Sequence, residues 1–202
     1  MLPEVFLSSP VATIAIFAAI FISDSLLTVY GARLYAEGAN RIIVMEGSYE
    51  LNPAYAADVD RFRAVTPRLL ATVTLFSILI WLAWYVFVDR SWFPPAYTFL
   101  VGVVLLVQGP VHVRHFRNIA TFRHANRGDG IGGRIEYGRR FAYRLSSIDL
   151  LSFAGLYAVL GLLAQSLFLL GGAFSTAMLA LRSHQQAGKI PPPASGPVRR
   201  ET

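Results

Sequence analysis

Residues 69–88 read LLATVTLFSILIWLAWYVFV and contain no charged side chain. A helix rises about 1.5 Å per residue, so a run of this length reaches across the ~30 Å of bilayer hydrocarbon. Aromatic residues gather at the end of the run, where amphipathic rings favour the membrane interface. The stretch therefore predicts a transmembrane helix.

Three further apolar runs flank this one on both sides, and we expect spans at about 10–32, 95–113 and 148–170. The last run continues apolar to residue 181, so Gly171 and Gly172 are interpreted as a break before a short interfacial helix over 173–183. The alternative is a hairpin of two shorter helices, which would place the C-terminus on the other side.

The composition agrees with a lipid environment. The 202 residues are 54% hydrophobic and 15% charged, whereas soluble domains carry about 25% charged residues. Cysteine is absent, which excludes disulfides, iron–sulfur centres and thiol nucleophiles. The sequence predicts an all-α polytopic membrane bundle over residues 1–184, followed by a disordered, proline-rich tail over 185–202.

Arginine placement predicts the orientation. The connection 33–68 holds five arginines and the connection 114–147 holds eight, whereas 89–94 holds one. Because positive charge favours the inner side, we expect both long connections in the cytoplasm and the N-terminus outside a cell (inner) membrane. The four basic residues after residue 181 oppose this assignment if only four spans exist.

Local signals predict structure in both connections. Asn52 followed by Pro53 is typical of a helix start, and predicts a short helix over 54–65 that Pro67 ends. The order Ser146-Ser147-Ile148-Asp149 suggests a capping box at the start of the fourth span. The proline of Gln108-Gly109-Pro110 predicts a kink with freed backbone carbonyls in the third span.

Asp24 is the one charged residue within the first predicted span. A carboxylate in a span is costly, so we expect it to face the bundle interior and to bind a proton or cation. Thr28, one turn on, could donate its hydroxyl to the carboxylate, and Gln108 and Gln165 are further polar partners. The alternative is a structural hydrogen bond that only holds helices together.

A basic, amphipathic stretch follows the third span. Its position beside the membrane favours anionic lipid over nucleic acid as its partner. The expected headgroup ligands are Arg114, Arg117, Arg123, Arg134, Arg139 and Arg140. His112 and His115 could also share a helix face and bind a metal, although interfacial polar residues are the favoured reading, and no cofactor is expected.

The order Asp24-x-x-x-Thr28, followed by Glu50-Leu51-Asn52-Pro53, resembles a pattern in small multi-pass membrane proteins of bacteria and archaea. Those proteins carry D-x-x-x-T in the first helix and E-x-N-P just after it. The resemblance covers about 30 residues. It implies a shared core of Asp24, Thr28, Glu50, Asn52 and Pro53, and it implies no activity.

Three classes of function follow. The first is a small oligomeric transporter or channel-like module with Asp24 at its polar centre, which is not an enzyme. The second is an accessory or scaffold subunit of a larger membrane complex. The third is an interfacial lipid-processing enzyme that uses His112, His115, His124 and Asp129.

Overall fold

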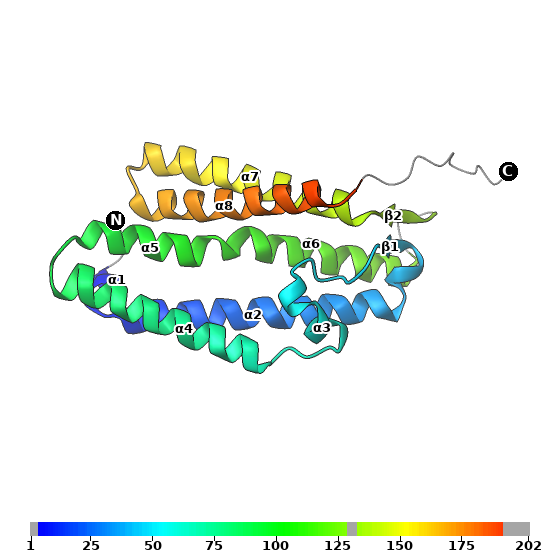
Figure 1. The fold of residues 1–202 in the computed structure, drawn as a ribbon, viewed down its shortest axis with the longest axis horizontal. Helices are drawn as coiled ribbons and strands as arrows, with labels where there is room; N and C mark the ends of the chain where they lie inside the picture. The colour runs from blue at the N-terminus through cyan, green and yellow to red at the C-terminus, as the bar shows by residue number, and fades with distance from the viewer. Residues whose placement is uncertain (1–3, 129–132, 192–202) are drawn as a thin grey trace.

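The computed structural model describes residues 4–128 and 133–191 (Figure 1). The described chain is mostly helical, with one pair of short strands. In chain order the elements are α1 (Glu4–Ser8), α2 (Pro10–Glu37), η1 (Ala39–Arg41), β1 (Ile43–Met45), α3 (Pro53–Asp60), α4 (Pro67–Trp84), η2 (Tyr85–Asp89), α5 (Pro94–Leu106), α6 (Gln108–Arg127), β2 (Ile135–Tyr137), α7 (Arg139–Leu163) and α8 (Leu167–Lys189).

The long helices form a flat, elongated bundle. The helices α5 and α6 run in line through its middle, with α2 and α4 on one side and α7 and α8 on the other (Figure 1). Four segments are long and apolar enough to cross a membrane: α2, α4 with η2, α5 with α6, and α7. The all-α membrane bundle predicted from the sequence is confirmed.

The helix start predicted at Asn52-Pro53 is present, and a second helix starts where the first connection ends. The side chain of Asn52 accepts a hydrogen bond from the Ala54 amide and Pro53 begins α3, while Thr66 accepts from the Leu69 amide and Pro67 begins α4. The helix α3 ends at Asp60, five residues before the predicted end.

Helices α5 and α6, which run in line, together form the central helix. A break at Val107 separates them, beside the predicted kink. Pro110 has no N–H to donate to the carbonyl of Leu106, four residues earlier. The hydroxyl of Tyr157 in α7 donates to that carbonyl instead, at 3.3 Å. The sequence therefore creates a free acceptor, and the neighbouring helix satisfies it.

The C-terminal run differs from its prediction. Helix α7 ends at Leu163, and α8 returns beside it from Leu167 to Lys189, so the break lies at 164–166 and the hairpin alternative holds. Gly171 and Gly172 are inside α8. A Cβ on Gly171 would overlap the carbonyl oxygen of Phe99, so this glycine permits close packing of α8 on α5.

Two related boundaries are corrected. Helix α7 begins at Arg139, so Ser146 and Ser147 are interior residues and not an N-cap; the Ser147 hydroxyl donates to the carbonyl of Ala180 in α8. The tail predicted to be disordered from residue 185 is helical to Lys189, and residues 192–202 lie outside the described part of the chain.

A small parallel sheet joins the two long connections. Strand β1 pairs with β2 in the register Ile43 to Ile135 and Met45 to Tyr137. Beneath β1, the residues Leu34, Ala39, Ile119 and Phe122 form a buried apolar cluster. The sheet thus ties the segment after α2 to the segment before α7.

Candidate functional site

Polar contacts join α2 to α6 along their length. The two helices run in the same direction, so residues later in α2 contact residues later in α6. Ser23 contacts His112 at 2.7 Å, and eleven residues later in α2 the carbonyl of Leu34 accepts a bond from Asn126 at 2.8 Å. Between these contacts the hydroxyl of Tyr30 accepts from Arg123. The register places Asp24 opposite His115.

Asp24 and His115 form the centre of the candidate site. The Nε2 atom of His115 lies 2.9 Å from Oδ1 of Asp24, and the two side chains are 5% and 25% exposed for His115 and Asp24 respectively. Among the described residues, neither Asp24 Oδ1 nor His115 Nδ1 has a hydrogen-bond partner of good geometry. The two side chains are therefore in close contact and have unused hydrogen-bonding capacity.

Thr28 reaches this pair in a different way from the one predicted. Its hydroxyl donates to the backbone carbonyl of Asp24 at 2.8 Å and lies 3.2 Å from Nε2 of His115. The expected bond from Thr28 to the carboxylate is corrected, because a threonine in a helix readily bonds the carbonyl four residues earlier. Thr28 instead contacts the imidazole.

The depth of Asp24 is set by its neighbour Ser25. The Ser25 hydroxyl donates to the carbonyl oxygen of Ala64, at 2.6 Å, in the segment just before α4. Asp24 therefore lies level with the start of α4, and Leu69 and Thr72 of α4 line the same cavity. Helix α4 therefore begins beside the middle of α2.

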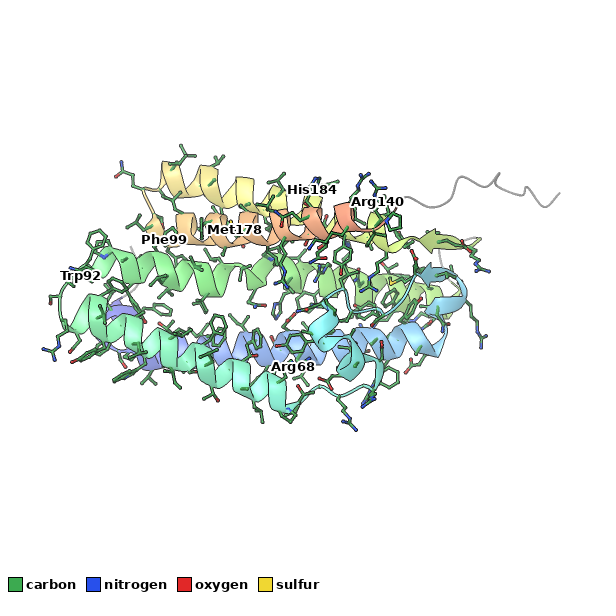
Figure 2. The ribbon with its side chains drawn as sticks, viewed as in Figure 1. Arg68, Trp92, Phe99, Arg140, Met178 and His184 are labelled. Atoms are coloured by element: carbon green, nitrogen blue, oxygen red, sulfur yellow. The ribbon has the colours of Figure 1, made fainter. Side chains whose placement is uncertain are left out.

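The cavity in front of this pair has a volume of about 860 Å³. Its walls come from α2, α3, α4, α5, α6, α7 and α8. Figure 2 shows two of these walls, with Arg68 at the start of α4 and Met178 on α8 on opposite sides of the central helix. All five residues that the resemblance groups together line it, as does Gln108: Asp24, Thr28, Glu50, Asn52 and Pro53.

A second cavity of about 370 Å³ adjoins the first. Glu50, Arg114, His115 and Ser146 line both cavities. The guanidinium of Arg114 donates to the hydroxyl of Ser146 at 2.9 Å, which connects α6 to α7 across the boundary. These side chains form the partition between the two cavities.

Glu50 brings a second acid to this partition. One carboxylate oxygen accepts the backbone N–H of Asn52 at 2.6 Å, inside the turn that starts α3. Burial raises the pKa of Glu50 above its ordinary value, although that bond and the positive charges of Arg114 and His115 partly oppose the rise. Burial likewise raises the pKa of the neighbouring Tyr49.

The arginines expected to bind headgroups make several internal contacts. Arg117 pairs with the half-buried Asp149 and Arg134 pairs with the exposed Glu136, each at 2.9 Å. Arg123 stacks on Tyr30 and Arg139 on Tyr143. The Nε atom of Arg140 is buried and has no hydrogen-bond partner among the described residues. Of the six, only Arg114 lines both cavities.

The two predicted metal ligands do not converge. His112 contacts Ser23 through Nε2 and the carbonyl of Gln108 through Nδ1, while His115 contacts Asp24. Within residues 4–128 and 133–191, no three histidine or acidic side chains form a metal-binding group. Asp129, the expected partner of His124 in the lipid-processing hypothesis, lies outside the described residues.

Gln165 does not belong to the site. It occupies the turn between α7 and α8 with a backbone φ of 49°, and its side chain is exposed. The expectation of an interior partner for Asp24 is therefore wrong at this position. The actual partner, His115, lies seven residues after Gln108 and so on the same helix face, which is the signal that could have identified it.

No family model, curated protein or solved structure matches the chain. The class of the protein rests on its fold. Four long apolar helices, each carrying few charges, identify an integral membrane protein with four candidate spans.

Proposed function

We propose that the chain is a small membrane transport module in which Asp24 and His115 bind and release a proton or a cation. The observation that carries this proposal is the Asp24–His115 contact in the wall of a cavity of about 860 Å³. An acid and an imidazole in contact are the groups used for proton relays in membrane transporters.

The arrangement of the two cavities supports exchange. His115 and Glu50 line both of them, so a proton bound at this partition is within reach of either space. Glu50 adds a second titratable group, and burial raises its pKa above the ordinary value. The Oδ1 atom of Asp24 and the Nδ1 atom of His115 have no hydrogen-bond partner among the described residues, so their hydrogen-bonding capacity is free for a bound proton.

We infer the orientation from the α7–α8 hairpin. Because α8 runs back beside α7, it returns the chain to the end of the bundle where β1 and β2 lie (Figure 1). Of the 16 Lys and Arg residues that the structure describes, 15 belong to the half of the bundle nearer that end or to the connections there, and Arg90 alone belongs to the other end. The positive end is cytoplasmic, with the N-terminus outside.

The test is proton or cation flux into vesicles that contain the purified full chain. A pH gradient or a potential is imposed, and internal pH is followed with a trapped dye. We expect the protein to accelerate flux and Asp24→Asn to remove the acceleration, because the amide binds no proton. His115→Gln should reduce it as well.

A matched control is available in Glu136→Gln. Glu136 pairs with Arg134 at the same 2.9 Å, but this pair is exposed and lines neither cavity. Its flux should equal that of the wild type. Wild-type flux no faster than in protein-free vesicles, or unchanged flux in Asp24→Asn, would overturn the proposal.

A further inference from the structure

The larger cavity changes from apolar to polar at one level on four helices. On α8 the lining residues include Phe174, Met178, Arg182 and Gln186, each four positions from the last, and their neighbours Ser175, Leu179 and Ser183 line the cavity as well. On the central helix, Val103 and Val107 precede Arg114, and on α2 Phe21 precedes Asp24. The cavity therefore has an apolar half and a polar half, like an amphiphile.

The level of this change matches the membrane boundary. Phe76 lies in the third turn of α4 and faces the apolar half, whereas Thr66 and Arg63 lie before the helix and line the polar half. Hydrocarbon ends where the apolar run of α4 begins, since Arg63 and Arg68 favour headgroups. The polar half is therefore at headgroup depth, and the apolar half at acyl-chain depth.

The cavity also has lateral access from the lipid. Helices α4 and α8 form two of its walls, yet they lie on opposite sides of the central helix and do not pack against each other (Figure 1). The lining residues Phe174 and Met178 are both exposed. An acyl chain could reach this space from the side without separating packed helices.

The charged side chains that line the polar half favour an anionic headgroup. Three guanidinium groups line the polar half, from Arg63, Arg114 and Arg182. Of the acids there, Asp24 contacts His115 and Glu50 accepts an amide, and Asp58 is the third. Arginine binds phosphate through paired hydrogen bonds and keeps its charge in partly dry surroundings.

We propose that the cavity binds a phospholipid with an anionic headgroup. The phosphate lies among Arg63, Arg114 and Arg182, and one acyl chain lies against Phe76, Phe174 and Met178. The volume of about 860 Å³ is within the ~300–1,000 Å³ common for ligand sites. As a lipid bound beside the proposed proton or cation site, this ligand rests on the proposed function, whereas its binding alone is tested without flux.

The experiment uses the full chain in vesicles that contain phosphatidylglycerol with a photoreactive diazirine in its acyl chain. Adducts are mapped by mass spectrometry. We expect labelling of Phe76, Phe174 or Met178, and reduced labelling when the probe is phosphatidylcholine. Arg182→Gln and Arg63→Gln should each lower cavity labelling several-fold, up to about tenfold, whereas Arg90→Gln at the other end should not.

Two residues of α8 provide a matched control, which distinguishes filling of the cavity from a general effect of a large side chain on the protein. Met178 and Leu181 are similarly exposed, at 51% and 49%, but only Met178 lines the cavity. Met178→Trp should remove the labelling of Phe76, and Leu181→Trp should leave it. Adducts confined to outward residues such as Leu151 and Leu163, or equal labelling by phosphatidylcholine, would overturn the proposal.

Two outcomes separate this inference from the proposed function. Asp24→Asn should keep cavity labelling while it loses flux, because the carboxylate does not bind the phosphate. Labelling without flux in the wild type overturns transport alone. In a parallel experiment, a photoreactive methionine analogue replaces Met178. Chain-to-chain crosslinks from it, together with no lipid adducts in the cavity, would show a second copy there and would overturn lipid binding.

Discussion

Tyr157 in α7 reaches across to α5 and donates its hydroxyl to the carbonyl of Leu106. Because Pro110 has no backbone N–H, this carbonyl lacks its usual helical donor. Gly109 leaves space for the phenol of Tyr157, since a Cβ there would lie 2.7 Å from the hydroxyl oxygen. The break in the central helix and the position of α7 therefore depend on each other.

Tyr157→Phe should lower the free energy of unfolding by about 1–3 kcal/mol, because it leaves a carbonyl unsatisfied in an apolar environment. Pro110→Ala supplies a backbone N–H to Leu106, so the same Tyr157 substitution should cost much less in that background. Thermal unfolding of the four proteins in detergent measures the coupling. Strictly additive effects would contradict this account of the break.

Gly102→Ala should destabilise the protein by several kcal/mol. A Cβ at this position would overlap the carbonyl oxygen of Phe168 in α8, and backbone atoms on both sides leave no room to adjust. Gly155→Ala is the control, since nothing lies within 4 Å of its Cβ position, and it should be neutral or slightly stabilising. Similar unfolding temperatures for both variants would contradict the close packing of α5 and α8.

Glu50→Gln should change the pH dependence of stability. The pKa of Glu50 is raised above its ordinary value of 4.5 by burial, so the folded chain holds this proton to higher pH than the unfolded chain. Its contribution to stability is complete below about pH 4.5 and is lost as pH rises through the raised pKa. Glutamine stays neutral and can still accept the Asn52 amide.

The measurement for Glu50 is the unfolding temperature of both proteins across a pH series in detergent. The advantage of Glu50→Gln over the wild type should grow from pH 4.5 upward and then level off. Glu136→Gln, in an exposed pair with Arg134, controls for removal of a negative charge. A constant difference between the Glu50→Gln and wild-type curves would mean that Glu50 does not hold its proton on folding.

Single cysteines can test the orientation, because the natural chain contains none. Trp92→Cys lies in the exposed turn before α5, and Gly188→Cys lies near the exposed end of α8. A membrane-impermeant maleimide added to intact cells should label position 92 at once and position 188 only after permeabilisation. Labelling of both from outside would show that α8 does not return the chain to the cytoplasm.

Much of the fold could be predicted from local sequence. The uncharged run over 69–88 needs only its length to indicate a span, and Asn52-Pro53 and Pro67 start helices through contacts within a few residues. The hairpin of α7 and α8 was harder to predict. A glycine such as Gly171 can break a helix or let two helices pack closely. Here it packs against Phe99, seventy-two positions away, and local sequence does not reveal that contact.

The candidate site, like the fold, could be predicted only in part from local sequence. Asp24 could be singled out because a charge in an apolar run is costly wherever the helix packs. Its partner His115 was harder to identify. The spacing of seven residues from Gln108 shows only that the two share a helix face, and the face of α6 that meets α2 is set by their whole interface. The depth of Asp24 also depends on a contact between Ser25 and Ala64, which no local pattern in either segment reveals.

The pairing of β1 with β2 has a mechanical consequence. It fastens the end of α2 to the start of α7, and α8 moves with α7 through their long contact. Helix α4 has no such fastening and packs chiefly on α2. A rearrangement that widens the cavity should therefore displace α4, which begins at Pro67, more readily than the helices that the sheet and the hairpin link together.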